Sequence, residues 1–574
     1  MPRANEQVEA VLNEYRDLLS VVGDDAFKSR AYEKAARSIG GYHADIRDFD
    51  LEELLDIPNV GKSIAEKVAE YLHTGSIPAL EELRAQIPAG VRQLISIPTL
   101  GPKKAMALYD ELHISSVEEL LDAIHEHRLA TVRGFGPKTE ENIMRGIQLL
   151  QQSGERVQLG AALDLAEELL ADLSGLKQVE RCEYAGSLRR MVETIGDIDL
   201  LVASADPVPV MEAFTTSSFV DRVVAHGETK SSILTTKGLQ VDLRVVPPDV
   251  WGAALQYFTG SKAHNIRLRE MAVRKKLKLS EYGLFHAETD ELIVAQAEEE
   301  VYERLGLPWI PPTLREDRGE IQAAAAAELP DVLELPQIRG DLHTHTDLTD
   351  GLAPLERMLE TAGQMRYAYY AITDHAPNLY MQRMTDEKML AQRDRVRKLQ
   401  PKYPKMQLLH GTELNIDPTG DVDWGPEFLD GFDLRVASVH SHFNQTREEM
   451  TRRICRAMEN PHVNVIGHPT ARMIGHRPPL DYDLEEVFRQ AARTGTALEV
   501  NSFPDRLDLN DEHILWARRH GVKFAVDTDS HSTVHLEFMR FGVGMAQRGW
   551  LTKEDVINAW PLTRLRKFLR KGRA

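Results

Sequence analysis

The spacing of hydrophobic positions divides the chain into a helical part, a mixed part and a part of alternating strands and helices. Up to about residue 155, hydrophobic residues recur every three or four positions, as in NEQVEAVLNEYRDLLSVV and SVEELLDAIHEH. This spacing places them on one helix face and predicts an all-helical first part. From about residue 158 to 315, helical stretches are mixed with β-rich runs such as IDLLVA, SSILTT and LQVDLRVV. This part is predicted to contain a sheet as well as helices.

Apolar runs of strand length alternate with helical stretches after residue 338. The runs are IRGDLHTH, YAYYAITDH, MQLLHGTELN, LRVASVHSHF, VNVIGHP, ALEVNS and KFAVDTDSH. Strands that are separated by helices pair in parallel, so the pattern predicts βα units in a barrel or a wound sheet. Most of these runs carry His, Asp or Glu at or near their end, and catalytic side chains of α/β barrels sit at such strand ends. Residues 314–337 hold an alanine run and prolines, which predicts a partly helical connector.

Length and cysteine usage agree with a multidomain protein of the cytosol. The 574 residues correspond to about three to five domains. Cys182 and Cys455 are the only cysteines and lie far apart, which excludes a disulfide framework or a thiolate zinc site and fits a reducing compartment. No apolar run approaches the roughly 18 residues of a membrane span, and the N-terminus does not resemble a signal peptide. We therefore expect a cytoplasmic protein without a membrane partner.

The net charge of −20 argues against a nucleic-acid partner when it is taken alone. Local clusters differ from this average, because residues 262–279 hold seven Lys or Arg and one Glu. Acidic residues can also gather where cations bind. The bulk charge therefore leaves the partner open.

A tight Gly/Pro turn followed by a helix occurs three times in the helical part. The copies are IPNVGKSIAEKV at 57–68, IPTLGPKKAMAL at 97–108 and VRGFGPKTEENI at 132–143. Such a turn directs free N–H groups and the helix dipole at an anion, which predicts helix-hairpin-helix motifs that bind DNA phosphates without reading sequence. The candidate contacts are Gly61, Lys62, Gly101, Gly134 and Gly136. Plain corners between two helices are the alternative.

Only the third hairpin has both glycines. Asn59 and Thr99 stand at the first glycine position of the other two. Asn tolerates a left-handed backbone and Thr does so poorly. The second hairpin is therefore predicted to bind DNA weakly.

Three aspartates fall in two predicted strands of the mixed part. Asp197 and Asp199 in GDIDLLV share one strand face, and Asp242 lies in LQVDLRVV between Gln240 and Arg244 on one face. If the strands are neighbours, the three carboxylates converge and raise one another's pKa. Divalent cations such as Mg²⁺ relieve this repulsion, and a pair of them can assist phosphoryl transfer. An exposed acidic strand end is the alternative.

The segments around these aspartates resemble DNA polymerase family X, the polymerase beta-like enzymes. The order is AGSLRR at 185–190, the Asp-x-Asp pair, a later lone Asp in a strand, and YFTGSKAHNIRLRE at 257–270. The resemblance covers residues 1 to about 315 and is most specific from 184 to 270. It implies an α+β palm that carries the aspartates.

The resemblance to family X implies a role for individual residues. Asp197, Asp199 and Asp242 would bind two ions, Mg²⁺ or Mn²⁺, and Asp242 would also activate the primer 3′-hydroxyl. Arg269 matches a template contact, and Arg244 a basic residue beside the third carboxylate. The residues that match nucleotide-binding positions are Gly186, Ser187, Arg190, Tyr257, Phe258, Gly260 and Asn265.

In family X the first hairpin belongs to a domain that binds the 5′-phosphate of a gap, and some members use a lysine there to remove deoxyribose phosphate. Lys67 matches that lysine and Tyr32 an aromatic of the pocket. Ser63 and Ala79 replace helping lysines of related proteins, so a solvated Lys67 without lyase activity is the alternative. Further candidate phosphate contacts are Lys28, Arg30 and Lys62.

The histidine-rich strand ends after residue 338 predict a metal centre. His343 and His345 share a strand face and can chelate one ion, and mixed imidazole and carboxylate ligands suit Zn²⁺, Mn²⁺ or Fe²⁺. The pattern resembles the PHP (polymerase and histidinol phosphatase) domain, which implies a distorted (β/α)7 barrel with up to three ions and metal-assisted phosphodiester hydrolysis. The matching ligands are His343, His345, Asp350, His375, Glu413, His440, His468, Asp529 and His531.

Residues beside these ligands are assigned separately. Thr349 replaces the usual Ser before Asp350. Asp341 and Asp374 are expected to orient imidazoles from outside the ligand set. Structural or exposed roles are expected for His442, His462 and His476.

These expectations define a multidomain architecture. It consists of a 5′-phosphate-binding domain at 1–85, a DNA-binding helix-hairpin-helix domain at 86–157, a palm at 158–248, a nucleotide-selecting domain at 249–315, a linker at 316–337 and a PHP domain at 338–574.

The sequence thus predicts a bacterial-type family X DNA polymerase that fills short gaps in DNA repair. Its expected partners are gapped or primer–template DNA and dNTPs, and it is expected to be a monomer. The PHP domain is expected to act as a 3′–5′ exonuclease, with AP endonuclease or 3′-phosphatase activity as further reactions. The alternatives are a PHP phosphoesterase with a non-catalytic, DNA-tethering N-terminal region, and a structural repair factor with both sites silent.

Overall fold

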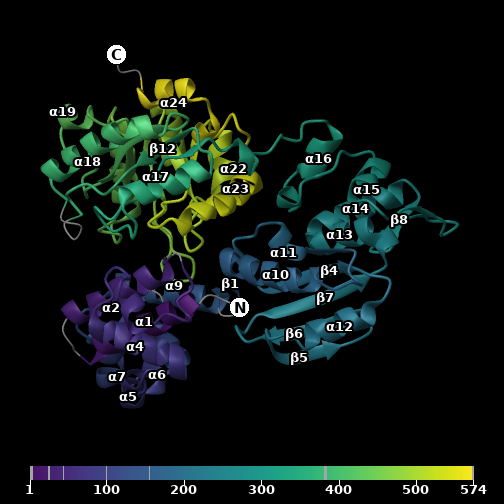
Figure 1. The fold of residues 1–574 in the computed structure, drawn as a ribbon, viewed down its shortest axis with the longest axis horizontal. Coiled ribbons are helices and arrows are strands. Elements are labelled where there is room, and N and C mark those ends of the chain that lie inside the picture. Colours follow the sequence, from purple (N-terminus) through teal and green to yellow (C-terminus); the bar gives the residue numbers. More distant parts are fainter. Residues whose placement is uncertain are drawn as a thin grey trace.

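The structure, a computed structural model, describes residues 4–22, 26–42, 44–97, 100–153, 156–379 and 384–571. Figure 1 shows a helical N-terminal part next to a C-terminal barrel, with an α+β part beside them. Thr99, on which the predicted weakness of the second hairpin depends, lies outside the described residues.

The N-terminal part is helical, as predicted, and its helices share one hydrophobic core. The core includes Leu12, Ile39, Val68 and Leu108, which come from four different helices. The helices are α1 Ala4–Val21, α2 Ala26–Gly40, α3 Leu51–Leu55, α4 Lys62–Thr74, α5 Pro78–Gln86, α6 Ala89–Ile95, α7 Pro102–Leu112, α8 Val117–His125 and α9 Pro137–Ser153.

A five-stranded sheet forms the centre of the middle part, in the order β2-β4-β7-β6-β5. Strands β4 and β7 pair in parallel, and the other neighbours are antiparallel. Its strands are β2 Arg181–Tyr184, β4 Asp197–Ala203, β5 Val220–His226, β6 Lys230–Thr235 and β7 Gln240–Val246. Helices α10 Leu159–Ser174 and α12 Pro207–Thr215 pack on it, α11 Gly186–Arg189 follows β2, and β1 Val157–Gln158 pairs with β3 Thr194–Ile195.

A second unit follows the sheet. It holds helices α13 Trp251–Thr259, α14 Lys262–Arg274 and α15 Glu298–Leu305 and the antiparallel strands β8 Leu277–Ser280, β9 Gly283–His286 and β10 Leu292–Val294. The short helix η3, Pro312–Leu314, ends this unit. The connector that follows contains α16, Glu320–Ala325, and is partly helical as predicted.

Seven parallel strands form the C-terminal part, in sequential order from β11 to β17. They are β11 Gly340–Asp341, β12 Tyr369–Ile372, β13 Gln407–Asn415, β14 Leu434–Ser438, β15 Val465–Ile466, β16 Ala497–Asn501 and β17 Phe524–Asp527. A parallel bridge between Thr344 and Ser530 brings the ends of the first and last strands together. The predicted choice between a barrel and a wound sheet is therefore decided in favour of a nearly closed barrel, and the predicted fold class is confirmed.

Helices surround this barrel, and apolar side chains fill it. Leu342, Leu409, Val465 and Ala525 lie in the interior core. The helices are α17 Leu355–Gln364, α18 Asp386–Leu399, α19 Pro426–Leu429, α20 Arg447–Glu459, α21 Leu484–Thr494, α22 Asp511–Arg519, α23 Met539–Arg548 and α24 Leu562–Leu569. Among the described residues, no helix is long and apolar enough to cross a membrane.

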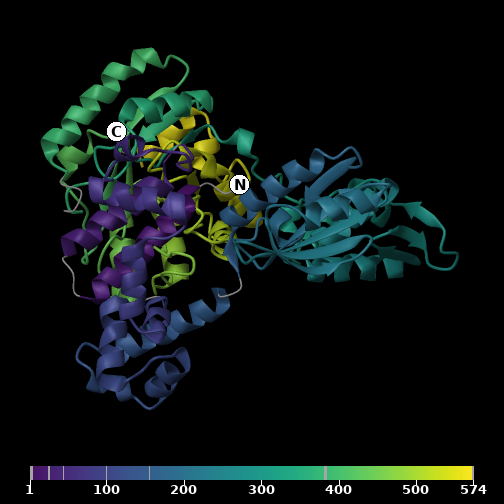
Figure 2. The same ribbon diagram turned by 60° about the horizontal axis from the view of Figure 1, so that its bottom comes forward.

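The segment between α11 and β3 of the middle part docks directly on the barrel. A Cβ atom added to Gly544 of α23 would lie 2.7 Å from the Met191 side chain, so the two surfaces approach closely. Arg472 of the barrel pairs with Glu193 at 2.6 Å. Figure 2 shows the helical part against the barrel from a second direction, and Arg37 of α2 lies 3.9 Å from Asp350 of the barrel.

Candidate metal centres and nucleotide site

The strand register places the three predicted carboxylates at one end of β4 and β7. Asp199 lies opposite Asp242, and Asp197 lies two positions before Asp199 on β4, opposite Gln240. Burial and, after it, the charges of Asp197 and Asp242 together raise the pKa of Asp199 to about 7. A divalent cation would relieve this repulsion, and oxygen ligands of this kind suit Mg²⁺ and Mn²⁺. The carboxylate set therefore fits the predicted ions.

Asp242 stays ionised in the same cluster. Burial raises its pKa, but hydrogen bonds from Gln240, Ser232 and Lys230 outweigh this effect and lower the pKa below its usual value. The Gln240 Nε2 donates to Asp242 Oδ1 over 2.8 Å, and Lys230 Nζ lies 3.1 Å from Oδ2. Lys230 was not identified from the sequence, where it is only a cation at the start of a β-rich run.

The first turn of α11 lies against the carboxylates. Gly186 has φ 57°, and a Cβ atom there would lie 2.2 Å from Asp199 Oδ2. Glycine is therefore required at this position both by the backbone and by the nearby carboxylate. Its backbone and Ser187 border the cavity described next.

All seven residues predicted to bind the nucleotide line one cavity of about 570 Å³, together with Asp197, Asp199 and Arg269. Asn265 Nδ2 donates to the Tyr257 carbonyl over 2.7 Å, which fixes the turn between α13 and α14. The Arg244 guanidinium lies 4.6 Å from the Phe258 ring centre, a cation–π contact. The structure thus brings these residues together, and their individual roles stay predictions.

Further residues that sequence reasoning missed also line this cavity, among them Glu316 and Arg548. Glu316 accepts a hydrogen bond from Arg190 Nε over 3.0 Å, and Arg548 reaches the cavity from the barrel. Arg190 Nη1 also donates to the Thr259 carbonyl over 2.7 Å. The predicted phosphate-binding guanidinium is thus held by Glu316 and by the backbone after α13.

Magnesium binding at the carboxylates is expected to weaken below neutral pH. The folded-state pKa of Asp199, about 7, lies above its usual value, so the proton on Asp199 stabilises the cation-free fold at low pH, and this contribution is lost as the pH rises through about 7. A cation must displace that proton, so Mg²⁺ affinity should fall by about tenfold from pH 8 to pH 6. Calorimetric titration with Mg²⁺ measures it, and a constant affinity would contradict the prediction.

Eight of the nine predicted barrel ligands fall into three overlapping groups whose ligand atoms lie within 4.8 Å of one another. The groups are His345, Asp350, His375 and His531; His343, His345 and Asp529; and His375, Glu413 and His440. The ninth, His468, places Nε2 3.1 Å from Glu413 Oε1. Parallel strand order explains this convergence, because the C-terminal ends of all strands meet at one mouth of a barrel.

Unpaired buried nitrogens show that these side chains fit metal ions. Among the residues that the structure describes, His343 Nε2 and His345 Nδ1 are buried without a hydrogen-bond partner. Burying polar atoms in this way is costly unless a ligand satisfies them. Their donor set of imidazoles and carboxylates suits Zn²⁺, Mn²⁺ or Fe²⁺.

Glu413 is the central carboxylate of the barrel mouth. Burial raises its pKa, but the imidazoles of His440 and His375 outweigh burial and hold the pKa well below its usual range. Its oxygens lie 2.8 Å from His375 Nδ1 and 3.0 Å from His440 Nε2. Glu413 therefore remains ionised, as a metal ligand must be.

A relative matches almost the whole chain. The DNA polymerase/3′-5′ exonuclease PolX of Bacillus subtilis (strain 168) is 34% identical over 557 residues, which is 96% of this chain and 97% of the relative. The chain belongs to the PolX family. Four segments of the chain also match known domains: a helix-hairpin-helix domain at 3–77, a SAM-like helix-hairpin-helix tandem at 91–148, the DNA polymerase beta thumb at 254–316 and a PHP domain at 341–503.

The matches to two more distant relatives each cover about half of this chain. DNA polymerase lambda of Rattus norvegicus is 25% identical over 340 residues, 54% of this chain and 55% of the relative. DNA polymerase lambda of Arabidopsis thaliana is 26% identical over 355 residues, 54% of this chain and 62% of the relative. The predicted resemblances to family X and to the PHP domain are confirmed.

The acid that orients the His343 imidazole is Glu499, and not Asp341 or Asp374 as the sequence suggested. Glu499 Oε1 lies 2.7 Å from His343 Nδ1, which turns Nε2 of that ring toward the metal groups. Asp341 instead accepts hydrogen bonds from the backbone and hydroxyl of Thr528. Asp374 accepts from the Thr346 backbone and hydroxyl. The expectation for these two aspartates was wrong, because both stabilise loops. The only sequence signal for Glu499 is an acid inside the apolar run ALEVNS.

The three unassigned histidines lie outside the metal groups. His442 is exposed and its Nδ1 lies 3.0 Å from the Ser441 hydroxyl. Buried His462 places Nδ1 3.5 Å from Asp430. His476 lies in the segment between Met473 and Arg477, which bridge to each other.

Removing the metal ions is expected to destabilise the barrel of this protein. Saturation with Mn²⁺ at about 100 times its dissociation constant should raise the free energy of unfolding by about 2.7 kcal/mol. The His345→Ala variant should lose most of this gain, because His345 belongs to two of the three groups. Thermal unfolding with EDTA and with Mn²⁺ measures the gain. An equal Mn²⁺ effect in both proteins would contradict the assignment.

The helix-hairpin-helix turns have the predicted geometry. Gly101 and Gly134 have φ 67° and 93°, and no atom lies within 4 Å of a Cβ added to either of them or to Gly61 and Gly136. Asn59 takes φ 66°, the left-handed backbone that the sequence predicted Asn to tolerate. These turns are open enough for a phosphate to approach the backbone, and their role in DNA binding stays a prediction.

Lys67 lies half-buried on α4. Its amine donates to the Ser63 hydroxyl over 3.1 Å and to the Ser63 carbonyl over 3.2 Å. The rings of Tyr15 and Tyr32 stack edge to face with centres 4.7 Å apart, and Lys67 acts electrostatically on Tyr15. The amine thus acts on Tyr15, which contacts Tyr32, the aromatic that the family X resemblance suggested, and lyase activity stays a prediction.

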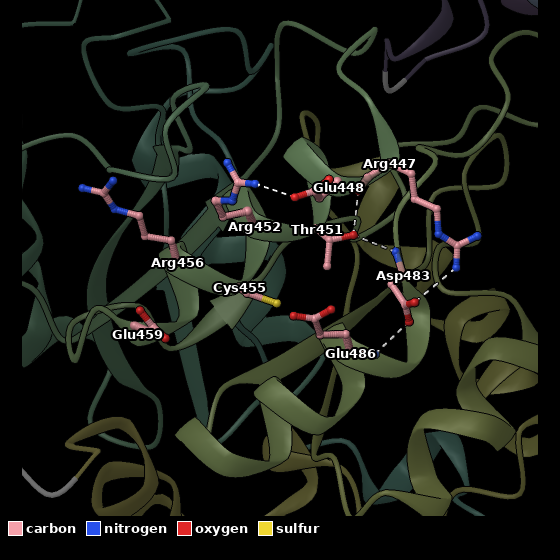
Figure 3. Close-up of a pocket in the computed structure, with 9 residues that line it drawn as sticks. All are labelled: Arg447, Glu448, Thr451, Arg452, Cys455, Arg456, Glu459, Asp483 and Glu486. Carbon is pink, nitrogen blue, oxygen red and sulfur yellow. Dashed lines mark hydrogen bonds and ion pairs between the residues drawn. The ribbon is translucent and has the colours of Figure 1, made fainter.

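A larger hollow, of about 720 Å³, lies on the outside of the barrel between α20 and α21 (Figure 3). Its charged side chains pair with each other, as Arg452 with Glu448 at 2.9 Å and Arg447 with Asp483 at 3.3 Å. Burial raises the pKa of Cys455 to about 12, so its thiol is unreactive. None of the described lining residues belongs to a metal group.

Proposed function

We propose that the chain is a template-directed DNA polymerase that fills short gaps during DNA repair and also trims DNA 3′ ends through its barrel. The observation that carries the proposal is the presence of two separate sets of ligand-type side chains: carboxylates beside the nucleotide-sized cavity, and imidazoles with carboxylates at the barrel mouth. The name of the Bacillus subtilis relative, a DNA polymerase/3′-5′ exonuclease, supports both activities.

In the proposed synthetic reaction, Asp197, Asp199 and Asp242 hold the divalent cations. Two such ions, when bound, stabilise the charge on the attacking and leaving oxygens. Asp242 orients the primer 3′-hydroxyl and accepts its proton. The backbone N–H groups of Gly186 and Ser187 and the Ser187 hydroxyl donate hydrogen bonds to the triphosphate.

The remaining cavity residues select and orient the nucleotide. Arg190 turns its guanidinium to the triphosphate, for which it is suited as a bidentate donor. Tyr257 and Phe258 lie against the sugar, Asn265 contacts the base and Arg269 the template strand. Their shared position in one cavity supports these roles.

In the proposed hydrolytic reaction, the nine barrel ligands hold up to three ions. Such ions, when bound, polarise the phosphodiester and supply the nucleophile at neutral pH. Glu499 keeps the His343 ring oriented, and the charge of Glu413 balances the imidazoles. AP endonuclease and 3′-phosphatase reactions at the same centre are part of this proposal.

The hairpins would grip the DNA phosphates on either side of the gap. The 5′-phosphate would lie near α2 and α4, where Lys28, Arg30 and Lys62 are exposed. Lys67 would act as the lyase nucleophile there.

Primer extension on gapped DNA with Mn²⁺, with and without dNTPs, tests the proposal. Extension with dNTPs and shortening of the primer without them are expected. Shortening without extension would favour the alternative of a phosphoesterase with a DNA tether, and neither reaction would favour a structural factor.

A further inference from the structure

We propose that Arg548, at the end of α23 in the barrel, is a positioning residue of the polymerase nucleotide site. It holds Glu316 and the end of α11 so that Arg190 faces the incoming triphosphate. This inference rests on the proposed function, because it takes the cavity beside Asp199 as the nucleotide site. It makes the barrel a contributor to synthesis as well as to hydrolysis.

Arg548 reaches across the domain boundary with one nitrogen. Its Nη1 donates to the Arg190 carbonyl over 2.8 Å and to Glu316 Oε1 over 2.7 Å. Figure 1 shows α23 on the side of the barrel that faces α11, and η3, just before Glu316, packs against α23. The contact therefore joins the barrel to both walls of the cavity.

The other nitrogens anchor Arg548 to the barrel. Its Nε and Nη2 donate to Asp511 Oδ2 over 3.0 and 2.7 Å, and its side chain is only 6% exposed. Asp511, the first residue of α22, also binds Arg318 at 2.9 Å. A buried guanidinium that is held at every nitrogen has a fixed position, so it can serve as a reference point for the cavity.

Glu316 is shared between two arginines. The same oxygen, Oε1, accepts from Arg190 Nε over 3.0 Å and from Arg548 Nη1 over 2.7 Å. When a triphosphate draws Arg190 away, Arg548 still neutralises Glu316. Without Arg548, the carboxylate would pair with Arg190 alone and would repel the triphosphate inside the cavity.

The test compares Arg548→Met with Arg540→Met in the full-length protein. Arg540 is a matched control, because it lies on the same helix and also bridges to the middle part, where it pairs with Asp164 and Glu167 at 2.9 Å on α10. It does not line the cavity as far as the described residues show. The readouts are kcat and KM for a dNTP on gapped DNA, with thermal unfolding of each variant.

Arg548→Met is expected to raise KM for the dNTP by about tenfold and to lower kcat less, whereas Arg540→Met should keep KM within about twofold of the parent protein. Adding Glu316→Gln to Arg548→Met should return KM to within about threefold of the parent, because it removes the uncompensated charge.

Three results would overturn the inference. One is an unchanged KM in Arg548→Met, and another is an additive loss in the double variant. The third is a joint loss of synthesis, of 3′ trimming and of thermal stability, which would mean that Arg548 only supports the fold. If the parent protein does not incorporate nucleotides at all, the proposed function fails and this inference fails with it. If the parent protein incorporates nucleotides and one of the three results is found, only this inference fails.

Discussion

Replacing Asp199 with Asn is expected to lower nucleotide incorporation on gapped DNA by on the order of 10³-fold, while trimming of 3′ ends continues. Asp199 lies between Asp197 and Asp242 in the carboxylate cluster, and Asn has the same shape without the charge that holds a cation. Asp197→Ala and Asp242→Ala should have the same effect. Single-nucleotide extension of a labelled primer with Mg²⁺ measures incorporation, and the same gel without dNTPs measures trimming.

The matched control is Asp221→Asn. Asp221 is an exposed aspartate on β5, at the edge of the same sheet and away from the cluster. Incorporation should be unchanged in this variant. Near-normal incorporation by Asp199→Asn would remove the proposed synthetic site, and loss of both reactions together would indicate misfolding or a single shared site.

Replacing Glu413 with Gln is expected to abolish 3′ trimming, by on the order of 10³-fold, and to leave incorporation intact. Glu413 contacts His375, His440 and His468 within 3.1 Å, so it is the anion around which the imidazoles gather. Gln places an amide of the same size there without the charge. His343→Ala should act in the same way. Release of labelled nucleotides from a single-stranded 3′ end with Mn²⁺ measures the effect.

His442→Ala serves as the control for the barrel. This histidine lies two residues after His440 but is exposed and outside the metal groups. Trimming should be normal in that variant. Trimming that survives in Glu413→Gln would show that the barrel mouth is not the hydrolytic centre.

Local spacing in the sequence was sufficient to predict much of the site. Alternate positions of a strand point to one face, so Asp197 and Asp199 could be placed together, as could His343 and His345. Seven strand-length runs separated by helices predicted the parallel sheet, and their acidic or histidine ends predicted a common mouth. These inferences succeed because strand periodicity and parallel pairing are decided within a few residues of each side chain.

The sequence by itself therefore determined the family and the class of each domain, and it predicted the side chains that would carry the chemistry. Only the tertiary structure decided which side chains support them. Glu499 lies 156 residues from its partner His343, and Arg548 lies 358 residues from Arg190. Such contacts depend on how whole domains dock, and no local spacing encodes that. For the same reason the expected roles of Asp341 and Asp374 were wrong. Closure of the barrel brings Thr528 to Asp341, and the pairing of β11 with β12 brings Thr346 to Asp374.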